Sequence, residues 1–239
     1  MAALVAAYPD FLARHEGNDI VWRDGTRMPF DDGRGVKDFE TMLDSPDLED
    51  MFYVPYPLGR SGLAPAVNVD PGRVRYQPFF AKMYGVCTRG EVTQHLTEVI
   101  WLPSRAGQRL RATRINGVAG RLQAISDELD RLPGDTMMFL VPSAGTYNCR
   151  VVAGTQRISA HGLGIAIDIA TAHSDYWRWD KPAPDGRYVH RNRIPWEIVE
   201  IFEKHGFVWG GKWYHYDTMH FEFRPEILAA ARQAEAAGR

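Results

Sequence analysis

The stretch that most constrains the fold of this 239-residue chain lies at residues 157–169 and reads RISAHGLGIAIDI. In its second half, small residues alternate with large aliphatic ones. If residues 163–169 form a β-strand, successive side chains point to opposite faces of a sheet. One face then carries the aliphatic side chains into a core. The other face carries only Gly164, Ala166 and Asp168, and forms a groove with small walls and a carboxylate at its far end.

A second segment further along the chain, DTMHFEF at residues 217–223, carries complementary side chains. In a strand, His220 and Glu222 would share one face while the two phenylalanines take the other. Asp217 lies one short turn before His220. With His161 from the first segment, two histidines and two aspartates are available, and we expect them to converge on one site.

The residue types in these segments are those of a catalytic zinc site. Such a site takes three protein ligands from histidine and carboxylate side chains and leaves one position for water. His161, Asp168 and His220 form such a set, and bound Zn²⁺ would lower the pKa of the water towards neutrality. Asp217 is placed to act as the general base that this water needs. Each half of the pattern is weak on its own, so a metal-free descendant of the fold is the alternative.

The joint pattern resembles a known family of peptidases. It reads S-x-H-x-x-G-x-A-x-D followed by D-x-x-H-F-E, and the similarity covers roughly residues 146–228. It resembles the zinc D,D-carboxypeptidases, a family that also contains vancomycin-resistance D,D-dipeptidases and L-alanyl-D-glutamate endolysins, all acting on peptidoglycan peptides. The resemblance implies that His161, Asp168 and His220 bind Zn²⁺. It also implies that Asp217 is the base, at a point where some members carry Glu and therefore a longer arm.

The resemblance also implies an arginine that binds the substrate. Relatives often carry an arginine near residues 145–150 that pairs with the substrate's carboxylate, and Arg150 occupies that place. The planar guanidinium group suits a carboxylate because it can donate two parallel hydrogen bonds. A surface role for Arg150 is the alternative, and Arg157 is the other candidate. Glu222 is a candidate acceptor that would orient a ligand histidine.

Hydrophobic periodicity and turn residues predict the remaining elements. Helices are expected in four segments: 76–84, 117–132, 194–205 and 225–236. Strands are expected as a hairpin at 97–102 and 108–115, and as a short buried strand at 136–142. Loops are expected at 58–75 and 171–193. The N-terminal residues 8–56 look irregular, with short helical pieces at 36–43 and 46–52.

This order of elements predicts one α+β unit, an antiparallel sheet with helices packed mainly on one side. The catalytic domain would span residues 76–239, and residues 1–75 would form an irregular N-terminal extension packed on it. The resemblance implies the small zinc-peptidase fold that is shared with Hedgehog-type domains.

Charge and hydropathy exclude some classes of protein. With 28 Lys and Arg against 30 Asp and Glu, the formal net charge is -2, and bulk electrostatics predict no nucleic-acid binding. No apolar run is long enough for a transmembrane helix, and the first residues do not resemble a secretory signal. The resemblance implies a periplasmic or extracellular location, because peptidoglycan lies outside the cytoplasm, although a cytoplasmic one stays open. In an exported protein Cys87 and Cys149 could form a disulfide, and a buried free thiol is the alternative.

The function implied by the resemblance is that of a zinc-dependent peptidase. It would hydrolyse peptide bonds of peptidoglycan stem peptides, or of related peptides with D-amino acids, as a D,D- or L,D-type carboxypeptidase or endopeptidase. One alternative is a module that keeps the fold and the zinc and binds cell-wall peptides without cleaving them; Asp217 argues against it, because binding needs no base. Another is a different hydrolase, such as an amidase, that uses the same metal ligands.

Overall fold

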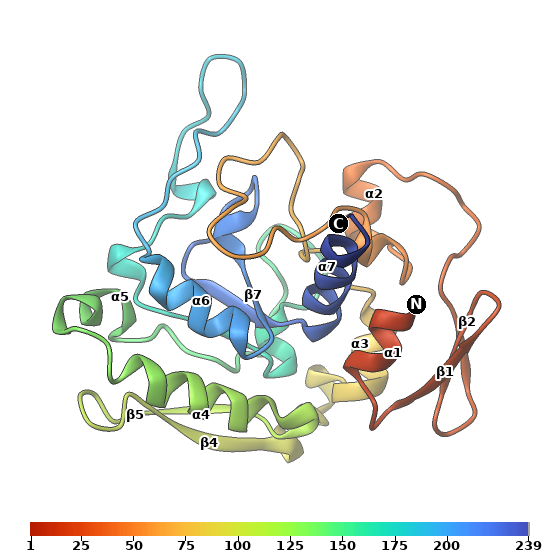
Figure 1. Cartoon of the computed structure of the whole chain (residues 1–239), viewed down its shortest axis with the longest axis horizontal. Coiled ribbons are helices and arrows are strands. Elements are labelled where there is room, and N and C mark those ends of the chain that lie inside the picture. Colours follow the sequence, from red (N-terminus) through yellow and green to blue (C-terminus); the bar gives the residue numbers. More distant parts are fainter. Residues whose placement is uncertain (239) are drawn as a thin grey trace.

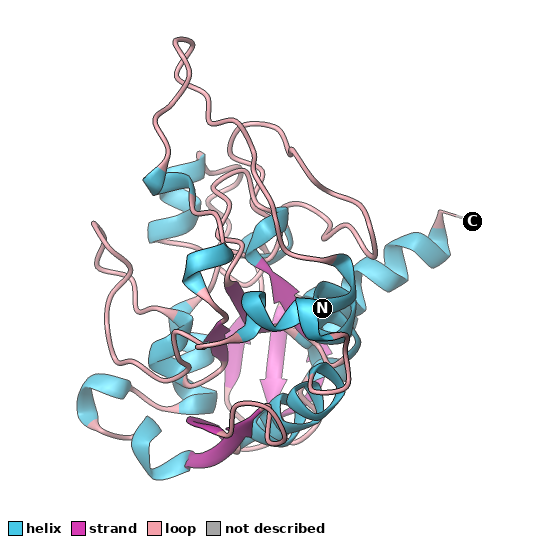
Figure 2. Ribbon diagram, turned by 90° about the vertical axis from the view of Figure 1, so that its left-hand side faces the viewer, coloured by secondary structure: helices cyan, strands magenta, loops and turns pink. Residues whose placement is uncertain are grey.

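Three short antiparallel sheets and seven α-helices make up the described part of the chain, residues 1–238, in the computed structural model. The strands near the N-terminus and the hairpin at residues 96–113 lie at the periphery of the molecule (Figure 1), and long loops gather at one end (Figures 1 and 2). The α+β class is confirmed, but the strands form three separate sheets rather than one.

The sheet that positions the candidate site consists of β6 (Ala166–Asp168), β8 (His220–Phe223) and β7 (Phe207–Trp209), in the order β6-β8-β7. Its register sets Asp168 directly opposite His220. Residues paired in this way on antiparallel strands carry their side chains close together on one face. The two sequence segments that were expected to converge therefore do so through strand pairing.

The strand predicted at residues 163–169 is shorter than expected, because Gly164 interrupts it. Leu163 ends a 3₁₀ helix, Ala160–Leu163, and Gly164 has a left-handed backbone with φ +69°. A Cβ atom at Gly164 would lie 2.9 Å from Leu96 Cδ2 and 3.1 Å from the backbone nitrogen of Thr113. Glycine is thus required here both for its conformation and for the close approach of the neighbouring hairpin.

That hairpin and its covering helices follow the sequence predictions. β4 (Leu96–Trp101) pairs with β5 (Gln108–Thr113), and α4 (Val118–Leu129) packs on both strands. Helix α4 buries Leu122, Ile125 and Leu129, which recur at helical spacing. The other predicted helices are also confirmed: α3 (Gln77–Tyr84), α6 (Trp196–Lys204) and α7 (Pro225–Ala237).

The strand predicted at residues 136–142 is wrong, because the segment is helical. A 3₁₀ turn, Gly134–Thr136, leads into the short helix α5 (Met137–Leu140). Methionine and leucine favour helices at least as well as strands, and only Leu140 is buried within α5. A short apolar run of this kind does not distinguish the two structures by periodicity.

The N-terminal region is more regular than predicted. After helix α1 (Ala2–Ala7), three strands form an antiparallel sheet: β1 (Leu12–Glu16), β2 (Asp19–Trp22) and β3 (Arg27–Pro29). The expected helical pieces are present as α2 (Phe39–Asp44) and a 3₁₀ helix, Asp50–Phe52.

The two terminal helices, α1 and α7, pack against each other (Figure 1). The Tyr8 hydroxyl donates a hydrogen bond to Glu226 Oε2 at 2.6 Å, and both side chains are buried. No helix within residues 1–238 combines the length and the apolar character that crossing a membrane requires. The boundary between residues 1–75 and 76–239 stays a prediction.

Candidate metal centre and its cleft

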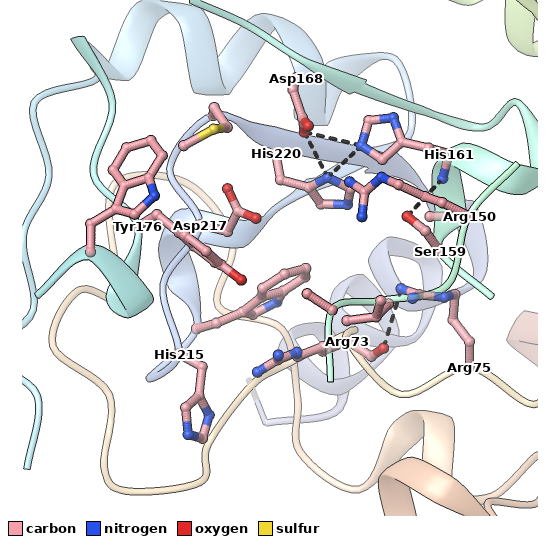
Figure 3. A pocket seen from close by; sticks show the side chains of 16 residues that line it. Arg73, Arg75, Arg150, Ser159, His161, Asp168, Tyr176, His215, Asp217 and His220 are labelled. Carbon is pink, nitrogen blue, oxygen red and sulfur yellow. Dashed lines mark hydrogen bonds and ion pairs between the residues drawn. The ribbon is translucent and has the colours of Figure 1, made fainter. Parts of the chain in front are cut away.

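The four residues expected at the site meet at the edge of the β6-β8-β7 sheet, and three of them meet at one point (Figure 3). His161 Nε2 lies 3.1 Å from Asp168 Oδ1, and His220 Nδ1 lies 3.0 Å from the same oxygen. The two ring nitrogens are 3.2 Å apart. Ligand atoms bound to tetrahedral Zn²⁺ at about 2.0–2.1 Å lie roughly 3.3 Å from one another. The separations and the donor types therefore fit a single zinc ion.

The second nitrogen of each histidine has its own acceptor. His161 Nδ1 donates to the carbonyl oxygen of Thr146 at 2.5 Å, and His220 Nε2 donates to Glu222 Oε2 at 3.1 Å. Histidines that bind metals usually have such partners, which fix the tautomer and the orientation of the ring. Both rings are thereby held with the remaining nitrogen facing Asp168. Glu222 lies where its expected role requires.

Local structure makes these positions rigid. His161 sits in the 3₁₀ helix Ala160–Leu163, where its backbone N–H donates to the Ser159 side chain at 3.3 Å. On the other face of β8, Phe221 is fully buried and stacks on Phe202 with ring centroids 3.8 Å apart. Packing on one face of the strand thus anchors His220 on the other.

The field at this point favours a positive charge. Burial alone would lower the pKa of His220, but hydrogen bonds with Asp168 and Glu222 outweigh it and raise the pKa to about 10. Burial would raise the pKa of Glu222, but Arg75 and His220 hold it well below its usual range. A divalent cation would supply the charge that these two carboxylates favour.

The Asp217 side chain faces the same cavity, and its carboxylate forms no hydrogen bond with the side chains of the three candidate ligands (Figure 3). Its Oδ1 is buried and has no hydrogen-bond partner among residues 1–238. Burial and the nearby charge of Asp168 raise the pKa of Asp217 to about 6. A close approach of Gly210 holds the backbone here, since a Cβ atom at Gly210 would lie 2.6 Å from the Asp217 carbonyl oxygen. An unpaired carboxylate with such a pKa suits a general base.

The two candidate arginines lie in different cavities. Arg150 lines the cavity next to His161 and makes no ion pair within residues 1–238, so its guanidinium group is available to a ligand. Arg157 lies in a neighbouring hollow, where its Nε is 3.4 Å from Asp44 Oδ1. Of the two, Arg150 is the one beside the candidate metal ligands.

A disulfide between Cys87 and Cys149, with Cα atoms 5.6 Å apart, anchors the chain next to Arg150. The free-thiol alternative is therefore wrong for this structure. The bridge closes a loop with a sequence separation of 62.

We expect reduction of this disulfide to lower the free energy of unfolding by roughly 2–4 kcal/mol, because the bridge restricts the unfolded chain. Urea denaturation with and without reductant measures the change. The double variant Cys87→Ser, Cys149→Ser provides the control, since reductant should leave its stability unchanged. Equal stability of the oxidised and reduced wild type would contradict the prediction.

The cavity has a volume of about 290 Å³, and its lining extends beyond the four expected site residues and Arg150. Two arginines, Arg73 and Arg75, come from the loop predicted at residues 58–75. Tyr176 and Trp179 come from the loop at residues 171–193, and two further residues lie just before Asp217: Trp213 and His215. Both segments were predicted as loops, but nothing in the sequence distinguishes Arg73 and Arg75 from surface arginines.

Comparison with known proteins supports the chemistry of the site. Residues 153–223 match the family model described as D-alanyl-D-alanine carboxypeptidase. This match supports a peptidase of the zinc-dependent family to which that model belongs, without indicating a particular member. It includes His161, Asp168, Asp217 and His220, and it begins just after Arg150. Neither the curated proteins nor the solved structures gave a match to the chain.

Proposed function

We propose that the protein is a zinc-dependent peptidase that hydrolyses peptide bonds of peptidoglycan stem peptides. The observation that carries the proposal is an unpaired, buried carboxylate, Asp217, in the same cavity as a donor set that fits zinc. A site that only binds peptides has no use for such a base. His161, Asp168 and His220 would hold the ion, which when bound acidifies water and polarises a carbonyl group.

The chain's own residues supply the remaining steps. Asp217 accepts the proton of the attacking water and returns it to the leaving amine. Arg150 binds a carboxylate of the substrate through its free guanidinium group. Arg73 and Arg75 also line the cavity, where the N–H groups that their ion pairs with Asp70 and Glu222 leave free can donate to an anionic peptide. Both carboxypeptidase and endopeptidase activity, of D,D or L,D type, are consistent with this arrangement.

We place the protein in the periplasm or outside the cell, where its proposed substrate lies. The disulfide between Cys87 and Cys149 supports this proposal, because structural disulfides persist mainly in oxidising compartments.

Digestion of purified peptidoglycan tests the proposed function. The metal content of the protein is measured first, and the products of the wild type are identified by mass before chelation, after chelation and after addition of Zn²⁺. We expect release of D-alanine or of cleaved stem peptides, loss of this activity on chelation, and its recovery with Zn²⁺. A zinc-loaded protein that binds the peptides and releases no product would instead favour the non-cleaving binding module.

A further inference from the structure

Beyond Arg150, a group of arginines lies on the far wall of the cleft. Figure 3 shows Arg73 and Arg75 across the cavity from Asp168 and His161. The same two arginines, together with Arg157, line a second hollow of about 30 Å³ that adjoins the cleft. The remaining residues of this hollow are mostly apolar or neutral: Leu43, Gln77 and Val152. The three arginine side chains are therefore its only charged groups within residues 1–238.

The protein's own carboxylates hold these arginines but use only part of their hydrogen-bonding capacity. Arg75 Nη1 lies 2.7 Å from Glu222 Oε2, and Arg73 Nη1 lies 2.5 Å from Asp70 Oδ2. A guanidinium group carries five N–H donors, and these ion pairs engage few of them.

Two buried donors in this group have no acceptor. Arg75 Nε and Arg157 Nε are both shielded from solvent, and neither donates a hydrogen bond to any group within residues 1–238. Within residues 1–238, Arg157 forms an ion pair only with Asp44, and the Asp44 side chain is 63% exposed, so that ion pair is weak. Burial lowers the pKa of Arg157, and the positive charges of Arg73 and Arg75 lower it further. Three neighbouring arginines, two of which have an unused buried donor, form a site that a bound anion would complete.

We propose that Arg73, Arg75 and Arg157 form an anion subsite that binds a second carboxylate of the substrate, in addition to the one at Arg150. This inference rests on the proposed peptidase function and narrows its substrate class to peptides with an internal acidic group. Arg73 and Arg75 precede residues 153–223, so the family match does not include them. Two of the three arginines of the subsite thus lie outside the family match, and the third, Arg157, lies within it.

The surroundings of the hollow support a carboxylate rather than a larger anion. Its volume of about 30 Å³ suits a small group. On the far side, an open groove of about 700 Å³ shares Arg157 and Gln77 with the hollow and carries two acidic residues, Glu40 and Asp44. The rest of a peptide could leave through this groove, while its acidic wall repels further anions. The carboxylate of a bound peptide would therefore be held at the arginines rather than in the groove.

Kinetics with a matched pair of peptides tests the subsite in the zinc-loaded protein. One peptide is a stem pentapeptide that contains D-glutamate and diaminopimelate, and the other is the same peptide with both internal carboxylates amidated. We expect the wild type to cleave the acidic peptide with a kcat/KM about tenfold higher or more, because a charged hydrogen-bonded pair is lost in the amide.

Arg157→Gln is the informative variant, because Arg157 has only the exposed Asp44 as an ion-pair partner and its loss should disturb folding least. It should raise KM for the acidic peptide about tenfold, with little change in kcat, and leave the amidated peptide unaffected. Arg157→Lys should recover part of the preference, since it restores the charge without the planar fork. Arg109→Gln is the control: Arg109 is exposed on β5 and pairs only with Glu98.

Equal cleavage of both peptides by the wild type would overturn the subsite and leave the proposed function intact. An equal loss on both peptides in Arg157→Gln would do the same. If zinc-loaded wild type cleaves neither peptide, the proposed function fails, and calorimetry with the same pair then decides the subsite. Tighter binding of the acidic peptide that Arg157→Gln abolishes would support it, whereas equal affinities would refute it.

Discussion

Replacing Asp217 with alanine is expected to lower kcat by roughly 10²–10⁴-fold, the usual contribution of a general base. The zinc content should not change, because Asp217 lies outside the three-residue donor set. Asp217→Asn should lose as much activity, since the amide keeps the shape and lacks the base. Asp217→Glu should stay within about tenfold of the wild type, because the carboxylate is kept at a different reach.

The matched control is Asp10→Ala, because Asp10 is an exposed aspartate that does not line the cleft. Activity and metal content are measured for all variants on the same peptidoglycan digest. If Asp217→Ala cleaves as fast as the wild type, the base assignment is wrong while the peptidase proposal stands. If Asp217→Ala also loses its zinc, Asp217 contributes to metal binding rather than to proton transfer.

We also expect Asp217 to affect the stability of the folded protein. In the metal-free protein, burial and Asp168 raise its pKa from 3.8 to about 6, so its ionised form destabilises the fold. A change of this size corresponds to roughly 3 kcal/mol. The sign follows from proton linkage: the folded state binds the proton more tightly, so the cost appears as the pH rises from about 4 to above 6.

Metal-free Asp217→Asn should therefore be more stable than metal-free wild type at pH 8 and about equal to it at pH 4. Thermal denaturation of both proteins at the two pH values measures this difference. A residue that destabilises the folded protein but is needed for activity serves catalysis rather than stability. A stability loss in Asp217→Asn at pH 8 would mark it as structural instead.

The sequence predicted the site residues that lie in segments with a recognisable local pattern. His161, Asp168 and His220 come from two short segments whose alternation marks them as strand and turn, and strand pairing joins them. Arg73 and Arg75 lie in a loop without periodicity, and only the folding of that loop over the cleft brings them near His220. No local sequence pattern predicts that these arginines reach the cleft.

The fold shows the same limit. Helix α4 was predictable because its buried residues recur at helical spacing over three turns. The first strand, β1, buries only Leu12 among five residues and shows no alternation, so nothing in its sequence indicates a strand. Helix α5 has four residues, too few for a helical period to be distinguished from a strand. Sequence reasoning missed the elements whose pattern of apolar residues is too short or too irregular to show a period.

Glu222→Ala should cause the largest loss of stability, about 3–5 kcal/mol. Glu222 is fully buried and accepts from three groups: Arg75 at 2.7 Å, Arg224 at 3.0 Å and His220 at 3.1 Å. Removing one partner of a buried ion pair leaves an uncompensated charge, which is the costly case. Arg224 retains Glu226 as a second partner, so Arg75 should bear most of the loss.

The same substitution should weaken zinc binding by about 10–100-fold, because His220 loses the acceptor that orients its ring. Glu222→Gln, which keeps the shape and one acceptor oxygen, should show a smaller loss in both measurements. Glu98→Ala is the control, since it breaks an exposed ion pair with Arg109 and should change stability by less than about 1 kcal/mol. Urea denaturation and zinc titration against a chelator measure the two effects separately. Because the two effects have different causes, a stability loss with unchanged zinc affinity would assign Glu222 to the fold alone and remove it from the metal centre.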